Sequence, residues 1–381
     1  MDLDFTWLLW GLPIAFALGW VASRLDLRQW RVASRQAPKA YFRGLNHLLN
    51  EQQDQAIDAF IEAVQSDPDT VELHFALGNL FRRRGDYDRA VRVHEHLLSR
   101  GDLGRKDRDR AQHALALDFL KAGLLDRAEA ALRKLDSSAF EGEALLALLA
   151  IAERSRDWVQ ASQVATRLEG SGQGSFASRL AHYLCEQAEQ ALRLGDSDRA
   201  WGLLIDATRQ APGLARGWLA MAQLKAQTGH SGEALDALLN LACHAPQSLP
   251  LAAVRMAELG HATKREAQVL AVLQSADAQG PTLDVTEALA SLSRDDTDAR
   301  QHYLAHLARE RSLVIAAQLL AGEALSLPQA KALIQASLNQ ASNPLKRYRC
   351  AACGFEAQQH FWQCPGCQSW DSYPARRVEE L

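Results

Sequence analysis

Cysteines clustered within residues 350–367 give the clearest chemical signal in this chain of 381 residues. The chain has six cysteines, and four of them form two C-x2-C pairs, Cys350 with Cys353 and Cys364 with Cys367. Each pair can direct two thiolates at one ion, and two pairs supply the tetrahedral four-sulfur site that suits zinc or iron. A glycine follows the first pair and a Pro-Gly dipeptide lies within the second, as tight turns require. The spacing therefore predicts one bound metal ion.

Two disulfides, or a redox-active C-x2-C motif, are the alternatives for this spacing. Disulfides need an oxidising compartment, which the N-terminus described below argues against. A redox motif usually occurs singly near a βαβ pattern, and none is visible. With four thiolate ligands no coordination position stays open, so the metal is predicted to be structural. Cys185 and Cys243 lie singly in helical segments and receive no role.

Residues 5–23 contain no charged side chain. A helix over this range rises about 28 Å, close to the hydrocarbon thickness of a bilayer. The acidic residues Asp2 and Asp4 precede it, and residues 24–36 are rich in arginine. This asymmetry predicts a single-pass anchor over 1–23 with the N-terminus outside and the chain after it in the cytoplasm. A cleaved signal peptide has its positive charges before the apolar segment, so the order of charges here is the reverse. A buried soluble helix is the alternative.

Small residues recur every four positions on one face of this anchor, at Gly11, Ala15 and Gly19. Such a face lets two membrane helices approach closely, which indicates a homodimer, and ordinary membrane composition is the alternative. The segment 24–36 is interpreted as a basic juxtamembrane region.

A 34-residue repeat fills much of the middle of the chain. Segments that start at 37 and 71, and others that start at 181 and 215, keep glycine, alanine and proline at matching offsets. These offsets resemble the tetratricopeptide repeat, a pair of antiparallel helices. We therefore expect repeats over 37–248, degenerate copies over 249–343, and an all-α solenoid with an N-terminal transmembrane helix and a small C-terminal metal ribbon. A helical array without this geometry is the alternative.

The concave face of such a solenoid is built from the first helix of each repeat and usually binds an extended partner. The side chains expected there are Phe75, Asn79, Arg82, Arg83, His113 and Lys121. A solvated helix face with no partner is the alternative, because charge runs are usually just exposed.

Composition and motifs exclude several function classes. The chain has 42 basic and 46 acidic residues, a balance that does not indicate nucleic-acid binding. It has no Walker loop, no G-x-G-x-x-G after a strand, no H-E-x-x-H and no G-x-S-x-G. His302 and His306 are four residues apart but lack a carboxylate partner motif. The sequence therefore predicts a protein that is not an enzyme.

The tail reads YRCAACGFEAQQHFWQCPGCQSWDSY, with C-x2-C-G-F followed by W-x-C-P-x-C-x-x-W. Together with the anchor, the basic flank and the repeats, it resembles the lipopolysaccharide assembly protein B family of the Gram-negative inner membrane. The resemblance implies a rubredoxin-like domain over 344–381 that binds iron. The residues themselves suit zinc equally well. The resemblance also implies that the four paired cysteines are the metal ligands.

The resemblance also implies an adaptor that restrains lipopolysaccharide synthesis. Members of the family promote degradation of the deacetylase LpxC by the protease FtsH, and gather lipopolysaccharide-synthesis proteins at the membrane. An electron-transfer protein and a scaffold for another envelope complex are the alternatives. The aromatic residues Phe355, Phe361, Trp362 and Trp370 exceed what a small ribbon can bury, so we expect the ribbon to dock on the repeats.

Overall fold

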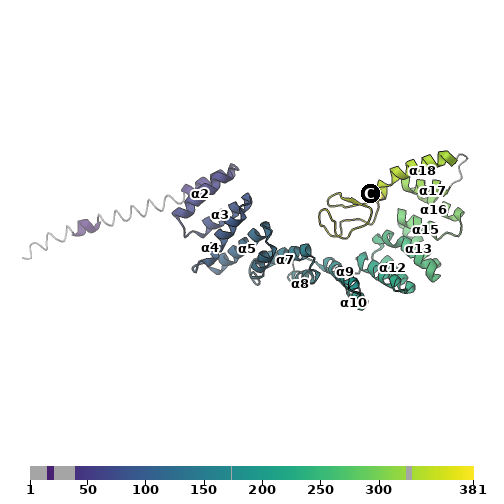
Figure 1. Ribbon diagram of the computed structural model, residues 1–381, viewed down its shortest axis with the longest axis horizontal. Coiled ribbons are helices and arrows are strands. Elements are labelled where there is room, and N and C mark those ends of the chain that lie inside the picture. The colour runs from purple at the N-terminus through teal and green to yellow at the C-terminus, as the bar shows by residue number, and fades with distance from the viewer. Residues whose placement is uncertain (1–14, 21–38, 173, 323–327) are drawn as a thin grey trace, which may run out of the picture. The chain divides into compact units, whose positions relative to one another are not determined.

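The computed structural model describes residues 15–20, 39–172, 174–322 and 328–381 (Figure 1). Within these ranges the chain is mostly helical and ends in a small ribbon. It divides into two compact units, Met1–Arg154 (unit 1) and Ser155–Leu381 (unit 2). The expected helical architecture with a C-terminal four-cysteine ribbon is confirmed.

Unit 1 is a stack of antiparallel helices. After a helical stretch over 39–49, its helices are α2 (Gln53–Ser66), α3 (Val71–Arg84), α4 (Tyr87–Ser99), α5 (Arg105–Lys121), α6 (Leu125–Arg133) and α7 (Glu141–Ser155). Successive helices pack on one another from α2 to α6. Alanine and leucine favour these helices, and buried alanines let their backbones approach.

Unit 2 continues the helical array and ends in the ribbon. Its helices are α8 (Trp158–Gly170), α9 (Ala177–Arg193), α10 (Ser197–Gln210), α11 (Ala215–Gln227), α12 (Ser231–His244), α13 (Pro250–Thr263), α14 (Glu266–Gln279), α15 (Leu283–Ser291), α16 (Asp296–Arg309), α17 (Leu313–Gly322) and α18 (Pro328–Ser342), with a short 3₁₀ turn η1 (Pro246–Ser248). Figure 1 shows these helices curving around the ribbon.

The helix positions confirm the predicted 34-residue period. Helix α3 begins at Val71 and α5 at Arg105, while α10 begins at Ser197 and α12 at Ser231, so each pair is offset by 34 residues. Gly85, Gly195 and Gly229 lie in the turns between paired helices with φ between 81° and 90°, a conformation that side chains other than glycine rarely adopt.

Close helix crossings explain a second class of small residue. At Gly78 of α3, an added Cβ would lie 2.5 Å from Nε2 of His94 on α4. Any larger residue would push the two helices apart. Small residues therefore mark the crossing points within a repeat, as the sequence pattern indicated.

The predicted membrane anchor over 5–23 lies mostly outside the described residues, as does the basic segment 24–36. Residues 15–20 are helical. In the described part of the chain, no helix has both the length and the apolar character needed to cross a bilayer. Anchoring therefore stays a prediction.

The ribbon (residues 344–381) contains little regular structure. It has the 3₁₀ turns η2 (Pro344–Lys346) and η3 (Val378–Glu380), and the strands β1 (Tyr348–Arg349) and β2 (Glu356–Ala357). The strands pair antiparallel, with Tyr348 opposite Ala357. This hairpin holds the first C-x2-C pair at its turn.

Candidate metal centre and its docking surface

The four paired cysteines converge on one point. Their Sγ atoms all lie within 4.8 Å of one another. The Sγ atoms of Cys350 and Cys367 are 3.8 Å apart, and those of Cys353 and Cys364 are 3.7 Å apart. A metal–sulfur bond of about 2.3 Å in a tetrahedral site places sulfur atoms about 3.8 Å apart, whereas a disulfide would bring them to about 2 Å. The geometry fits one metal ion and excludes disulfides in this arrangement.

Two similar backbone turns present these thiols. In the first, the Gly354 N–H donates to the Cys350 carbonyl, and in the second the Gln368 N–H donates to the Cys364 carbonyl. Gly354 and Gln368 both have positive φ, at 78° and 60°. The first turn uses the glycine that the sequence pointed to, while the second places a glutamine in the left-handed region. Both turns aim a cysteine pair at the same point.

Local hydrogen bonds favour thiolates at two of the four positions. Burial alone would raise the pKa of Cys350, but hydrogen bonds from Ser372 and from backbone N–H groups lower it to about 6. The hydroxyl oxygen of Ser372 lies 3.3 Å from that sulfur, and that of Ser369 lies 3.4 Å from Sγ of Cys367. The pKa of Cys367 is lowered, chiefly by Ser369.

The thiol of Cys353 shows why a cation is needed. The backbone N–H of Phe355 favours the Cys353 thiolate, but the partial loss of solvent around its sulfur and the neighbouring cysteines outweigh it and raise the pKa of Cys353 to about 12. Four adjacent thiolates repel one another unless a cation lies between them. Cys350 and Cys364 are buried, whereas Cys353 and Cys367 are exposed. The donor set therefore suits zinc or iron and does not choose between them.

The core of the ribbon includes a residue from the helical array. Tyr348, Cys350, Cys364 and Tyr373 are buried together, with Leu251 of α13 packed against them. Burial raises the pKa of Tyr348 to about 12. The buried side of the metal centre therefore lies where the ribbon contacts the helices of unit 2.

Aromatic side chains make a second part of this contact, which confirms the expected docking. Trp370 lies over His182 of α9, with ring centroids 4.6 Å apart, and edge-on to Trp158 of α8 at 6.3 Å. Trp362 packs against the main core of unit 2. Phe355 is the exception, since 43% of its surface is exposed.

A polar contact between the buried His182 and the more exposed Asp371 lies beside the tryptophans. The carboxylate of Asp371 accepts hydrogen bonds from Nε2 of His182, at 2.7 Å, and from the Ser178 hydroxyl, at 2.9 Å. Nδ1 of His182 is buried with no partner among the described residues. Burial lowers the pKa of His182, although Asp371 opposes that shift. The ring is therefore neutral and donates from Nε2.

The C-terminal segment (residues 374–381) connects the ribbon to two further helices. Arg377 makes two hydrogen bonds to Asp284 of α15, at 2.8 and 3.1 Å, and covers the ring of Tyr348. The Glu379 carboxylate accepts from Leu313 N–H at the start of α17, and Glu380 accepts from Leu283 N–H at the start of α15. Carboxylates at helix N-termini satisfy free N–H groups and complement the helix dipole.

The predicted groove residues have varied surroundings in unit 1. Phe75 is only 2% exposed and packs in a core with Leu97 and Leu103, so it offers no surface to a partner. Asn79 and Arg82 are joined by a hydrogen bond, and Arg82 also pairs with the buried Asp118. Their positions in the repeat predicted a groove role for these side chains. Repeat positions carry no information about the contacts that the side chains make within unit 1.

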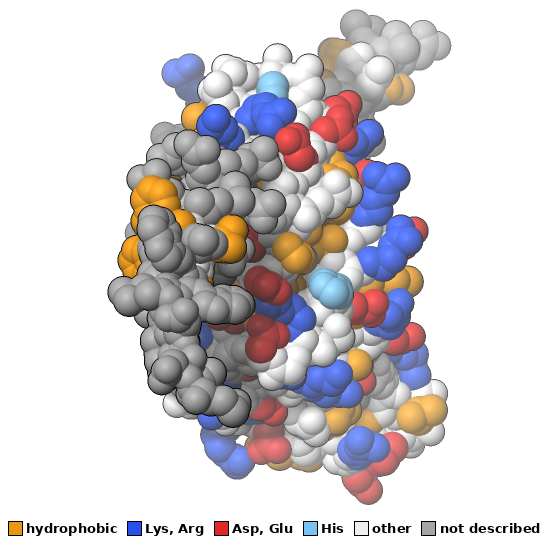
Figure 2. All heavy atoms as spheres, turned by 90° about the vertical axis from the view of Figure 1, so that its left-hand side faces the viewer, with side chains coloured by type: hydrophobic (Ala, Val, Ile, Leu, Met, Phe, Trp, Pro, Cys, Tyr) orange, Lys and Arg blue, Asp and Glu red, His pale blue; other side chains and the backbone are white. Residues whose placement is uncertain are grey.

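The other three predicted groove residues are either exposed or in contact with residues near the start of α7. His113 stacks on Phe140, and its Nε2 lies 3.2 Å from Glu143. Arg83 and Lys121 are exposed. On the face shown in Figure 2, basic and acidic side chains are interspersed rather than separated by sign. The groove role of Arg83, His113 and Lys121 stays a prediction.

His306 has a structural partner, since its Nδ1 lies 2.8 Å from the Thr286 hydroxyl in a buried contact. Cys185 is buried in α9, where burial raises its pKa to about 12. Cys243 is exposed.

Sequence reasoning did not identify Asp371, Arg377, Glu379 or Glu380 as docking residues, because their partners are far away in the chain.

Comparison with known families supports the ribbon directly. The family described as "rubredoxin metal binding domain" matches residues 348–373. This range contains all four converging cysteines and both serines that lie beside their sulfur atoms.

Whole-chain relatives extend the similarity well beyond the ribbon. Lipopolysaccharide assembly protein B of Escherichia coli (strain K12) is 31% identical over 385 residues, covering 97% of this chain and 98% of the relative. The protein of that name from Haemophilus influenzae is 28% identical, covering 95% and 96%. A solved tetratricopeptide repeat protein from Parabacteroides merdae is 14% identical with a TM-score of 0.34, covering 68% of this chain and 99% of its own.

Proposed function

Because this chain belongs to the lipopolysaccharide assembly protein B family, we propose that it is a membrane-anchored adaptor that regulates lipopolysaccharide synthesis. The adaptor promotes degradation of the deacetylase LpxC by the protease FtsH and gathers lipopolysaccharide-assembly proteins at the inner membrane. The tetratricopeptide-type array supplies protein-binding surface, and no catalytic residue is assigned. Full-length similarity to relatives with this name is the observation that carries the proposal.

The anchor belongs to the same proposal. The uncharged run over 5–23 and the arginines that follow it support an orientation with the N-terminus in the periplasm and the repeats in the cytoplasm. Anchoring raises the effective concentration of the adaptor around membrane-bound partners. The small-residue face at Gly11, Ala15 and Gly19 provides a surface on which two copies pair.

The metal has a structural role in this proposal. Cys350, Cys353, Cys364 and Cys367 hold the ion, iron by resemblance and zinc as the alternative, and it supplies folding free energy to the ribbon. The ribbon then holds the starts of α15 and α17 through Glu380 and Glu379. It thereby stabilises the surface that unit 2 offers to partners.

The test is LpxC abundance in cells depleted of the native protein and complemented with variants. Wild type restores LpxC turnover, whereas the Cys364→Ser, Cys367→Ser double variant and a chain lacking 1–23 each leave LpxC stabilised and lipopolysaccharide in excess. The Gln358→Ser, Gln359→Ser double variant, at exposed ribbon residues that are not metal ligands, is the matched control. If wild type itself leaves LpxC turnover unchanged, the proposed regulation is wrong.

Orientation is tested separately with reporters fused after Leu381. A reporter that works only in the cytoplasm is expected to be active and to mark the cell periphery. Activity of a periplasmic reporter at the same position would overturn both the orientation and the argument for reduced thiols.

A further inference from the structure

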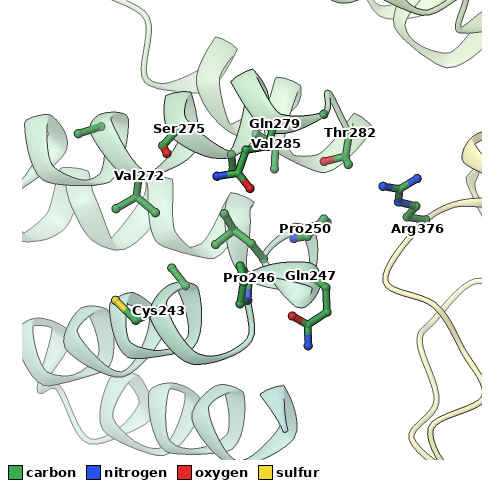
Figure 3. A pocket seen from close by; sticks show the side chains of 15 residues that line it. Cys243, Pro246, Gln247, Pro250, Val272, Ser275, Gln279, Thr282, Val285 and Arg376 are labelled. Carbon is green, nitrogen blue, oxygen red and sulfur yellow. The ribbon is translucent and has the colours of Figure 1, made fainter. Parts of the chain in front are cut away.

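An open cavity of about 680 Å³ lies within unit 2, away from the metal centre (Figure 3). Its walls come from the end of α12, η1, α14 and the start of α15, and the C-terminal segment closes one side. Val272, Val285 and Leu249 are among the apolar residues that line it. A volume of this size accommodates a few side chains of a bound ligand.

Among the described residues that line this cavity, Arg376 is the only one with a formal charge. Figure 3 shows it reaching from the C-terminal segment towards the side chains of the helices. Arg376 is exposed and makes no ion pair with any residue that the structure describes, whereas the adjacent Arg377 is bound to Asp284. The charge of Arg376 acts on Glu380, but no carboxylate is paired with it directly, so the guanidinium at the cavity edge stays able to bind an anion.

A buried hydroxyl that lines the same cavity also lacks a partner. Thr282 is 7% exposed, and its Oγ1 has no hydrogen-bond partner within the described part of the chain. Thr282 precedes α15, where a threonine side chain commonly caps the helix. Here the Thr282 side chain makes no such bond, although its neighbour Leu283 donates its N–H to Glu380. A buried polar group without a partner is costly, and a ligand atom can satisfy it.

A second cavity, of about 520 Å³, shares Arg376 and Gln247 with the first. Trp362 and Tyr373 of the ribbon are among its lining residues. Its one acidic lining residue, Asp371, is already bound by Ser178 and His182. The two cavities therefore adjoin each other at Arg376 and Gln247, so one extended ligand could reach both.

We propose that these cavities form a binding groove for an extended protein segment that presents a carboxylate to Arg376 and places an adjacent apolar side chain beside Val272 and Val285. Gln247 and Gln279, which also line the larger cavity, supply amide groups suited to a peptide backbone. The inference rests on the proposed adaptor function, because it assigns a place where unit 2 receives a partner protein. The carboxylate comes either from a chain terminus or from an Asp or Glu side chain.

The charge count favours a peptide carboxylate over a phosphorylated lipid. A phosphate group is usually held by several cationic or N–H donors, and this lining has one cation. A single guanidinium instead matches one carboxylate with two parallel hydrogen bonds. The mixed apolar and amide walls fit a short peptide better than a long acyl chain.

The test uses the full-length protein in detergent and fluorescein-labelled hexapeptides that carry Leu, Val, Phe or Ala beside the anionic position. One arm has a free C-terminal carboxylate, a second has an internal Glu with an amidated C-terminus, and a third has Gln with an amidated C-terminus. At least one peptide from the first two arms is expected to bind, with its third-arm counterpart at least about tenfold weaker. Comparison of the first two arms identifies the source of the carboxylate.

The matched variants are Arg376→Glu and Arg311→Glu. Arg311 is exposed in unit 2 and lines neither cavity. For the best peptide, Arg376→Glu is expected to weaken binding at least about tenfold, Thr282→Val to weaken it less, and Arg311→Glu to change it less than about twofold.

Three results would overturn the groove: no peptide binds at millimolar concentration, amidated Gln peptides bind equally well, or Arg376→Glu binds like wild type. Stronger Arg376-dependent binding of dihexanoyl phosphatidic acid than of any peptide would also overturn it, and would make the cavity a lipid site. Restored LpxC turnover without peptide binding would refute the groove alone and leave the proposed function standing.

Discussion

Two histidine–aspartate pairs show how differently the two units hold their buried polar groups. In unit 1, His94 of α4 contacts Asp118 of α5, and both side chains are fully buried. Asp118 also accepts from Arg82 of α3, so three successive helices share one carboxylate. In unit 2, the buried His182 of α9 contacts Asp371, which the ribbon supplies from 189 residues further along the chain.

In unit 2 the ribbon supplies polar partners that neighbouring repeats supply in unit 1. Neighbouring repeats satisfy one another in unit 1, as in an ordinary solenoid. In unit 2, groups on α9, α15 and α17 are satisfied by the ribbon through Asp371, Glu380 and Glu379. The ribbon is therefore an integral part of unit 2, and its metal should affect that unit more than unit 1.

The largest expected effect is loss of the metal. Full-length wild type should hold one ion per chain, red with thiolate charge-transfer absorption if iron and colourless if zinc. The Cys364→Ser, Cys367→Ser variant should hold far less, because structural four-ligand sites contribute about 10–16 kcal/mol of apparent binding free energy. Elemental analysis of freshly prepared protein measures this, with Cys243→Ser as the control. Much less than one equivalent in wild type with intact thiols would contradict the site.

The next largest effect concerns unit 1. Replacing Asp118 by alanine leaves His94 buried without its partner and removes the ion pair of Arg82, which should cost about 3–5 kcal/mol of unfolding free energy. Urea unfolding followed by circular dichroism measures the change. Asp54→Ala, which removes an exposed pair with Arg84, should cost under about 1 kcal/mol. Equal costs for both variants would show that the buried network does not stabilise unit 1.

A smaller effect is expected where the C-terminal segment meets α15. Arg377→Ala removes two charged hydrogen bonds to Asp284 and should destabilise unit 2 by about 1.5–3 kcal/mol. Arg349→Ala, which breaks a more exposed pair with Glu356 within the ribbon, should cost under about 1 kcal/mol. Urea midpoints from tryptophan fluorescence distinguish them, and an unchanged midpoint for Arg377→Ala would mean that this contact does not hold the ribbon.

The smallest effect is a dependence on pH. Burial lowers the pKa of His182 below 6.5, so the unfolded state binds the proton more readily, and stability should fall as the pH drops below about 6.5. Asp371 also has a lowered pKa, because hydrogen bonds from His182 and Ser178 outweigh burial, but its contribution is lost only below 3.8. His182→Gln keeps a donor for Asp371 and should reduce the change in urea midpoint between pH 7.5 and 5.5, while His113, His306 and His360, whose pKa values burial also lowers, supply the rest. An unchanged slope would exclude His182 as its source.

Local patterns predicted the metal centre and the repeats. The C-x2-C spacing fixes which sulfur atoms meet, since each turn is closed by hydrogen bonds four residues apart, such as Gly354 to Cys350. The helix offsets follow from small residues at crossings, such as Gly78 beneath His94. These features depend on residues that are close in the chain or in the adjacent helix.

The sequence did not predict contacts between residues that are far apart in the chain. Arg82 was expected to face a partner, but Asp118, a residue of the next repeat, neutralises it. Surplus aromatics indicated that the ribbon docks, and Trp370 does so, yet nothing in the sequence paired Asp371 with His182. Such pairs depend on how the chain folds back on itself, which neither periodicity nor motif spacing records.

The most direct test is hydrogen–deuterium exchange of the full-length protein with and without its metal. Removal of the metal by a chelator under reducing conditions should speed amide exchange at the starts of α15 and α17, where Glu380 and Glu379 accept from Leu283 and Leu313. Exchange in α3 to α5 of unit 1 should stay unchanged. Equal protection of α15 and α17 in both forms, with the metal shown to be absent, would contradict the account that the ribbon is an integral part of unit 2.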